Sequence, residues 1–421
     1  MRTFSILVVV LGMFLTLGGC RPEGSVTPRP SFTVSFDNEA NPLQARFAAF
    51  LTDEEGKVQA FRWLNLTDTS HLQIRFSDYK AYDCTVVKMT VTATSTYPDT
   101  VVELTTYRGL KDQTNIRLGV ADSAVVITDL KVRFSGLTSL DTIIVPDGLT
   151  FIRPQSVNSY FGHYNIRHYG DFWLRAKFDG EDHWRYMVFN NYLAGDLSVE
   201  LLKAQLPTLS FPNPVIQLPF TAPWKYQIQG EANGKLMPVG DLTRAPGNAV
   251  PVLGSLEVFR PENMTFSRYR VQLKGAGPGA NPVTYYSDRF YTVLPQMVTL
   301  PSFDVETTIL GDNRSVGVQC NGQFDALLAK RGYIGSMSLY WTAFISPVAG
   351  GIVTHRLPDV PEALSGLFPV LKNYGFNQPL TVSAESYDAL DGLDAVQSAY
   401  YHPANYWWQA QAGLTGIERS F

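Results

Sequence analysis

The chain has 421 residues, enough for about two to four domains, and its 34 basic and 38 acidic residues give a net charge of −4. This mild acidic excess argues against a nucleic-acid partner and against a polybasic membrane patch. Aromatic residues make up 13% of the chain and charged residues only 17%, and with 33 glycines and 26 prolines this composition predicts many short strands joined by turns.

The chain begins with a basic residue followed by an apolar segment. Arg2 precedes the uncharged run at 4–17, which is the order found in secretory signals. As a helix this run would rise about 21 Å, which is short of the ~30 Å hydrocarbon core of a bilayer. The alternative is a short anchor or a buried core helix, but a core helix would carry polar residues at helical spacing. We therefore predict a cleaved signal peptide over 1–19.

The four residues LGGC at 17–20 resemble the lipobox of bacterial lipoproteins. In that family an apolar residue stands three places before a cysteine, small residues lie between them, and the cysteine thiol receives diacylglycerol. The resemblance implies that Cys20 begins the mature protein and that its lipid anchors the protein in the cell envelope, at the outer membrane. Surface-exported lipoproteins of Bacteroidota often carry an acidic cluster after this cysteine, whereas here only Glu23 follows. The proline-rich residues up to 31 are typical of an extended tether.

Alternation of apolar and polar residues predicts strands through the rest of the chain. Because successive side chains of a strand point to opposite faces, half-buried strands are expected where the alternation is regular, at 85–94, 130–134, 268–274 and 336–345. Turn-forming residues at 52–58 and 178–184 predict hairpins. Hairpins favour antiparallel sheets, so we expect an all-β fold of tandem antiparallel β-sandwich domains, immunoglobulin-like or transthyretin-like, with a few short helices.

Helical signals are few. An acidic N-cap and a C-terminal glycine predict a helix over 325–332. A second helix is predicted within 361–375 and is broken by Pro369. Residues 196–207 fit either a helix or a strand. These short segments do not support a doubly wound α/β fold.

Two proline-containing segments, at 145–154 and 294–304, separate regions of alternating residues and predict domain boundaries. The expected organisation is a signal peptide, a lipidated tether, two β-sandwich domains and a C-terminal β-rich domain, at 1–19, 20–31, 32–147, 148–300 and 301–421.

Motifs of phosphate-binding loops, zinc proteases and serine hydrolases do not occur in the sequence, so we predict no catalytic residues and no cofactor. A hydrolase with an unrecognised site is the least favoured alternative, since the distance between two catalytic carboxylates does not follow from one sequence. Apart from Cys20, only Cys84 and Cys320 are present. This number excludes a disulfide-dense scaffold, and we expect two separate, buried thiols.

Candidate metal ligands are also sparse. His163 and His168 are five residues apart, so on a strand they would point to opposite faces, and we expect surface or core histidines. Four acids follow one another in steps of three, at 385, 388, 391 and 394, without the spacing of an EF-hand loop. We expect them to form a solvated, turn-rich acidic face, and we predict no metal site.

Aromatic residues concentrate at 400–408, where Tyr406, Trp407 and Trp408 are the candidate ligand-binding residues. Exposed rings on a rigid sandwich can stack on the faces of sugars, whereas buried rings fill a core, and core packing is favoured for the cluster as a whole. On a strand, the adjacent Trp407 and Trp408 would point to opposite faces.

The function predicted from these features is a non-catalytic binding or adhesion role, toward a glycan or a protein, in a protein held at the membrane by its N-terminal lipid. The alternative is a structural or assembly component of an outer-membrane complex.

Overall fold

The structure is a computed structural model, in which the described residues fold mainly into strands with a few short helices. This confirms the prediction of an all-β fold. Cys20 and the predicted signal peptide lie outside the described residues. The residues that the structure describes are 31–37, 45–65, 69–75, 77, 79–93, 98–118, 128–135, 142–144, 151–152, 160–166, 170–192, 197–202, 205–208, 214–232, 235–239, 250–252, 254–258, 264–277, 283–309, 314–346, 352–402 and 408–421.

The N-terminal strands form a two-layer sandwich. The sheet β4-β1-β7 faces the strands β3-β2-β5-β6, and Phe36, Leu51 and Cys84 belong to the apolar cluster between them. The hairpin predicted at 52–58 is confirmed, since it joins β2 to β3. The strands are β1 (Phe32–Asp37), β2 (Ala45–Thr52), β3 (Val58–Trp63), β4 (Ser70–Ile74), β5 (Ala81–Ala93), β6 (Pro98–Lys111) and β7 (Thr114–Arg117).

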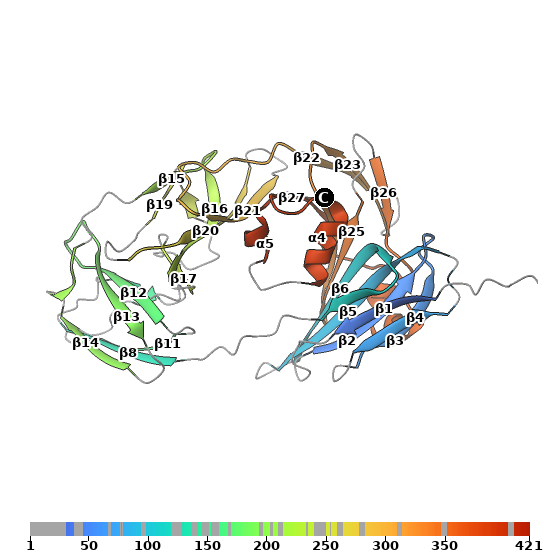
Figure 1. Ribbon diagram of the computed structural model, residues 1–421, viewed down its shortest axis with the longest axis horizontal. Helices are drawn as coiled ribbons and strands as arrows, with labels where there is room; N and C mark the ends of the chain where they lie inside the picture. The colour runs from blue at the N-terminus through green and yellow to red at the C-terminus, as the bar shows by residue number, and fades with distance from the viewer. Residues whose placement is uncertain are drawn as a thin grey trace, which may run out of the picture.

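The middle of the chain forms several further sheets. In Figure 1, β8 and β11–β14 lie at the opposite end of the molecule from the N-terminal strands, and β16, β20 and β21 lie between the two ends. The hairpin predicted at 178–184 is confirmed, because it joins β12 to β13. The ambiguous segment 196–207 contains a strand, β14. The strands are β8 (Thr128–Ser135), β9 (Thr142–Ile144), β10 (Phe151–Ile152), β11 (Tyr160–Ile166), β12 (Gly170–Lys177), β13 (Arg185–Tyr192), β14 (Leu197–Leu202), β15 (Val215–Gln217), β16 (Ala222–Ala232), β17 (Lys235–Pro238), β18 (Val250–Val252), β19 (Ser255–Glu257), β20 (Arg268–Ala276) and β21 (Thr284–Tyr291).

The C-terminal part combines strands with the described helices. The predicted break at Pro369 is confirmed, because this residue starts α3 after α2 has ended. The elements are β22 (Asp304–Ile309), β23 (Ser315–Asn321), β24 (Ala326–Ile334), β25 (Ser338–Ile345), β26 (Ile352–Arg356), α2 (Glu362–Leu367), α3 (Pro369–Lys372), β27 (Thr381–Tyr387), α4 (Gly392–Tyr401), α5 (Trp408–Ala412) and β28 (Leu414–Ser420).

One 13-stranded sheet runs through all three parts of the chain, in the order β17-β16-β20-β21-β28-β27-β24-β25-β6-β5-β2-β3, with β18 paired to β16. The N-terminal strands join the C-terminal ones through the parallel pair β6–β25, and the middle strands join them through the antiparallel pair β21–β28. Strands that are far apart in the sequence therefore form one continuous surface. The domain boundaries expected near 147 and 300 stay predictions.

The central strands of this sheet are covered on both faces. Leu327 of β24 belongs to an apolar cluster with Val318 of β23, whereas Leu328 belongs to another cluster with Val396 of α4. The predicted helix over 325–332 is therefore wrong, since β24 occupies these residues. A short apolar run that is buried on both faces has no strand-like alternation, so its pattern does not separate a buried strand from a buried helix.

The prediction of strands with one buried face holds better for the alternating segment in β25 than for the one in β5. In β25, Leu339, Trp341 and Ala343 are buried as expected, but Phe344, which the alternation places on the opposite face, is buried as well. In β5, Val87 is buried as expected, but Val91 is 59% exposed. Thr85 and Val86, on neighbouring positions of β5, are also buried. This part of β5 lies between two apolar layers, so the prediction of a half-buried strand is wrong there.

Cys84 and Cys320 are unpaired and buried, which confirms the expectation of two separate thiols. Within the described part of the chain, no helix has the length and the apolar character needed to cross a bilayer. The same residues contain no group of three or more His, Cys, Asp or Glu side chains that could hold a metal ion.

Candidate functional site

A pocket of about 320 Å³ lies on the long sheet, where strands β16, β20 and β21 approach α5 and the start of β28. This volume falls at the small end of the range found for ligand pockets, which is about 300–1,000 Å³. The residues that line this pocket come from elements that are separated in the sequence by up to about 190 residues.

Two rows of residues cross the strands beneath the pocket. In the first row, Lys225 of β16 lies opposite Lys274 of β20, which lies opposite Tyr286 of β21, and the row continues through Gly416 of β28 to Glu385 of β27. Directly opposite residues of antiparallel strands project from the same face of a sheet, so these side chains share one surface.

The second row is parallel to the first and lies two residues away from it on every strand. It places Gln227 opposite Gln272, and Gln272 opposite Asp288, before it reaches Leu414 and Tyr387. Side chains two residues apart on a strand point to the same face, so the two rows form one patch. The pocket is therefore bounded by lysines on one row and by amides on the next.

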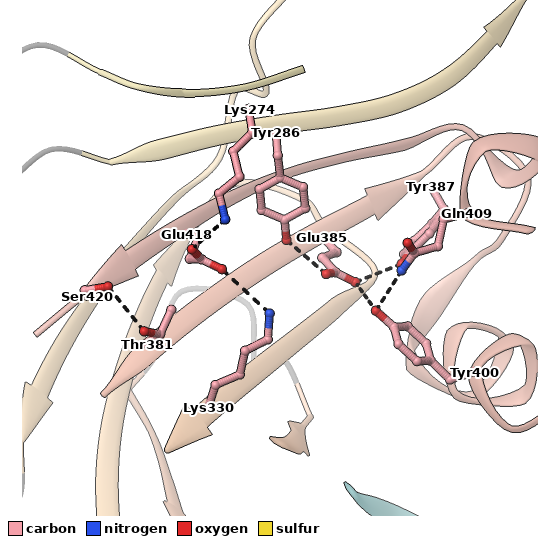
Figure 2. Close-up of polar contacts among 10 residues, drawn as sticks. All are labelled: Lys274, Tyr286, Lys330, Thr381, Glu385, Tyr387, Tyr400, Gln409, Glu418 and Ser420. Atoms are coloured by element: carbon pink, nitrogen blue, oxygen red, sulfur yellow. Dashed lines mark hydrogen bonds and ion pairs between the residues drawn. The ribbon is translucent and has the colours of Figure 1, made fainter. Parts of the chain in front are cut away.

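Tyr286 connects the pocket wall to the interior. Its hydroxyl donates a hydrogen bond to Oε1 of Glu385 at 2.9 Å, across the intervening strand β28 (Figure 2). Gly416 makes this crossing possible, since a Cβ atom at this position would lie 2.6 Å from the Tyr286 hydroxyl oxygen. Any larger residue at position 416 would displace the tyrosine ring.

Glu385 is the centre of a buried hydrogen-bond network and is only 3% exposed. Its Oε2 accepts hydrogen bonds from the hydroxyls of Tyr387 at 2.8 Å and Tyr400 at 3.1 Å. The Tyr400 hydroxyl accepts in turn from Nε2 of Gln409, a residue of the pocket wall, at 3.1 Å (Figure 2). Phenol donors compensate the desolvation of the carboxylate through charge-assisted hydrogen bonds.

The phenols of this network stay protonated. Burial raises the pKa of the Tyr286 and Tyr400 hydroxyls well above the usual value of 10, and the neighbouring carboxylate of Glu385 raises it further. The same two causes, with burial the larger, raise the pKa of Tyr387. All three side chains therefore act as hydrogen-bond donors to Glu385 at neutral pH.

A buried ion pair fixes the amide row. Nε and Nη2 of Arg270 donate to the two carboxylate oxygens of Asp288, at 2.8 and 2.6 Å. Nε2 of Gln272 donates to Oδ2 of the same carboxylate at 2.9 Å. The alternation at 268–274 places Arg270 on a solvated face, but its pairing with Asp288 allows it to be buried. Gln272 is thereby held in one orientation at the pocket.

Of the three residues predicted for ligand binding, the structure describes Trp408 alone. Tyr406 and Trp407 are outside the described residues, as is Cys20. Trp408 begins the helix α5 rather than lying on a strand, and its ring stacks on Tyr387 at a centroid distance of 5.8 Å. It therefore packs against the Glu385 network behind the pocket, and its contact with a ligand stays a prediction.

The predicted acidic face is wrong for one of its four members, because Glu385 is buried whereas Asp388, Asp391 and Asp394 are exposed. Among the predicted histidines, His163 lies on β11 and His168 lies outside the described residues. Gln272 and Lys274 fall on the polar side of the alternation at 268–274, and nothing local in the sequence marks them as ligand-binding residues. One sequence feature does point to them. Strand β16 contains Lys-x-Gln and strand β20 contains the reverse, Gln-x-Lys, so that antiparallel pairing of the two strands places lysine opposite lysine and glutamine opposite glutamine.

No family model matches this chain, and no curated protein matches it. Among solved structures, the SGBP-B protein of a Bacteroides ovatus mixed-linkage glucan utilization locus, in complex with a mixed-linkage heptasaccharide, aligns over 89% of this chain and 89% of its own, with 10% identity and a TM-score of 0.10. A TM-score this low does not show a common fold, and nothing about this chain follows from the alignment.

Proposed function

We propose that this chain is a lipid-anchored protein of the cell envelope that binds a glycan, without turnover, in the pocket between β16, β20, β21 and α5. The observation that carries this proposal is the set of amide side chains around one tyrosine, namely Gln227, Gln272 and Gln409 around Tyr286. A primary amide donates and accepts hydrogen bonds at once, as sugar hydroxyls do. A tyrosine adds apolar area with a polar tip, which suits the face of a sugar ring.

The rigidity of the pocket also supports binding. Asp288 holds Gln272, and Glu385 holds Tyr286, so two of the lining side chains are fixed before a ligand arrives. Fixed side chains lose little conformational entropy on binding, which favours affinity. Gln272 and Tyr286 both project from strands of the long sheet rather than from loops.

A binding role is preferred to hydrolysis because of how the nearby carboxylates are engaged. Asp288 accepts hydrogen bonds from Arg270 and Gln272, and Glu385 is enclosed by phenols. Neither carboxylate is left to protonate a glycosidic oxygen or to activate water in the manner of a glycosidase pair. We therefore expect bound glycans to be recovered intact.

The test is a glycan array with soluble protein that begins after Cys20, followed by titration of the best ligand. Gln272→Ala should weaken binding about tenfold, the effect of losing roughly one hydrogen bond. Gln319→Ala, on the separate sheet β22-β23-β26, is the matched control and should bind as the unchanged protein does. Absence of binding to any glycan, or equal affinities of the two variants, would contradict the proposal.

The lipid anchor rests on the LGGC sequence alone and has its own test. Cys20→Ala should abolish labelling with a fatty-acid probe and should move the protein from the detergent phase to the aqueous phase. Since binding is proposed to reside in the pocket, this variant should keep its affinity for the glycan. A Cys20→Ala protein that still takes up the lipid label would contradict the anchor without affecting the binding site.

A further inference from the structure

Two lysines lie side by side at one end of the pocket. Lys225 of β16 and Lys274 of β20 are directly opposite each other and both line the pocket. The Cβ atoms of such pairs are about 4.5–5.5 Å apart, and like charges placed directly opposite each other are destabilising. A pair that is unfavourable in the free protein becomes favourable when an anion lies between the two ammonium groups.

The acidic residues nearby do not neutralise this pair. Lys225 is exposed and forms no ion pair with any residue in the part of the chain that the structure describes. Nζ of Lys274 lies 3.1 Å from Glu418, but the same carboxylate also lies 3.6 Å from Nζ of Lys330 (Figure 2). One acid thus pairs with two lysines, while Lys225 has no acidic partner among the described residues.

The carboxylates of Asp288 and Glu385 do not neutralise the positive charge of the two lysines. Asp288 is engaged by the guanidinium of Arg270, which cancels its charge within the second row. Glu385 is buried behind Tyr286 and interacts with phenol donors. Counted over the described residues, the lysine end of the pocket therefore carries an excess of positive charge, next to the tyrosine and the amides that are proposed to hold sugar hydroxyls.

From this arrangement we infer that the glycan bound by the pocket is acidic, with a carboxylate or a sulfate group that lies between Lys225 and Lys274. This inference rests on the proposed glycan binding and adds the class of the ligand. The sugar ring lies against Tyr286, its hydroxyls bond to the amide row, and its anionic group reaches the lysine pair. A lysine ammonium recognises an anion as a point charge, so it accepts either group.

The first experiment compares each acidic glycan with a partner that lacks only the charge. Polygalacturonate is titrated against its carboxyl-reduced form, and a sulfated glycan against its desulfated form. We expect at least one acidic member to bind about tenfold or more tightly than its neutral partner, with an affinity that falls as salt is added. The pair that shows the difference identifies the anionic group.

The second experiment uses charge-removing variants. Lys225→Gln and Lys274→Gln should each weaken binding of the acidic glycan about tenfold, and should weaken binding of its neutral partner clearly less. Lys372→Gln on α3 is the matched control, because this lysine is exposed and does not line the pocket. Thermal unfolding of all three variants verifies that each one folds as the unchanged protein does.

The outcomes separate the inference from the proposed function. Equal binding of the acidic and neutral partners, or equal affinities of the Lys225→Gln and Lys372→Gln variants, would overturn the acidic ligand and leave glycan binding in place. Binding to no glycan at all would overturn both.

Discussion

The hydroxyl of Tyr286 reaches across a whole strand to bond with Glu385 at 2.9 Å, and this contact joins the pocket wall to the buried side of α4 and α5. The link continues through Tyr400 to Gln409, which is itself part of the pocket wall. The network thus begins and ends at the pocket. Its residues determine the shape of the site although only two of them line it.

The first prediction concerns the glycine beneath the Tyr286 ring. Gly416→Ala places a methyl group 2.6 Å from the Tyr286 hydroxyl oxygen, so the ring has to move. We expect a loss of about 1–3 kcal/mol in the free energy of unfolding, as for other overpacked sites, together with weaker glycan binding. Urea unfolding and the glycan titration measure the two effects.

The control for this change is Gly366→Ala on α2, where an added methyl group meets nothing within 4 Å. An alanine in a helix is favoured over glycine, so this variant should be unchanged or more stable by up to about 1 kcal/mol. Equal stability of the Gly416→Ala and Gly366→Ala proteins would contradict the role given to Gly416.

The second prediction removes the charge at the centre of the network. Glu385→Gln keeps the shape of the side chain but weakens the hydrogen bonds from three phenols, so the free energy of unfolding should fall by about 1–3 kcal/mol. Glu362→Gln, on the exposed face of α2, makes the same chemical change and should have almost no effect.

The same variant has a spectroscopic consequence. The negative charge of Glu385 contributes to the raised pKa of Tyr286 and Tyr400, so its removal should lower both values. In an alkaline titration followed by ultraviolet absorbance, these phenols should ionise at lower pH in Glu385→Gln than in the unchanged protein. Superimposable titrations would show that the carboxylate does not act on them.

The sequence predicted those parts of the fold whose elements have one buried face. The alternation in β25 and the turn residues before β3 and β13 are local signals, and the structure agrees with them. The failure at β24 has a physical cause, because helices cover one face of this strand and a second sheet covers the other. Such layering is a property of the tertiary structure and leaves no periodic pattern in the strand itself.

The candidate site was less accessible to sequence reasoning. The pairing of β21 with β28 brings Tyr286 next to Gly416, which lies 130 residues later in the chain. No local sequence pattern predicts that these two residues are neighbours. Glu385 looks like the first of four solvated acids, but three tyrosine hydroxyls allow it to be buried. Buried polar residues are recognised by their partners, and partners from distant strands become visible only in the structure.

The third prediction concerns Asp325, which the sequence suggested as a helix N-cap. It does cap a helix, but one that begins 67 residues later, because its Oδ1 accepts from the backbone N–H of Gly392 at 3.1 Å. Its Oδ2 accepts from the backbone N–H of Tyr387 at 2.8 Å. Asp325→Ala should therefore lower the free energy of unfolding by about 1–3 kcal/mol, measured by urea unfolding.

Asp391 supplies the matched control for this change. It occupies the N-cap position of α4, yet its side chain makes no capping hydrogen bond. Asp391→Ala should cost less than about 0.5 kcal/mol, the usual effect of a surface substitution. If Asp391→Ala proves the more damaging variant, the start of α4 is capped locally and the assignment to Asp325 is wrong.

The last prediction concerns stability in acid. His355 of β26 is 3% exposed, and its Nε2 has no hydrogen-bond partner among the described residues. Burial, and to a smaller extent the charge of Arg108, lower the pKa of this imidazole to about 3 from the model-peptide value of 6.5. Between these two values the unfolded chain binds a proton that the folded protein does not. The free energy of unfolding should therefore fall as the pH is lowered from about 6.5 toward 3, by up to about 1.4 kcal/mol per pH unit from this group.

The test is a His355→Phe variant, whose free energy of unfolding, measured with urea between pH 6.5 and 3, should depend less steeply on pH. His71→Phe on the exposed edge of β4 should leave this dependence unchanged, and an equal slope in the His355→Phe protein would show that the acid sensitivity arises elsewhere.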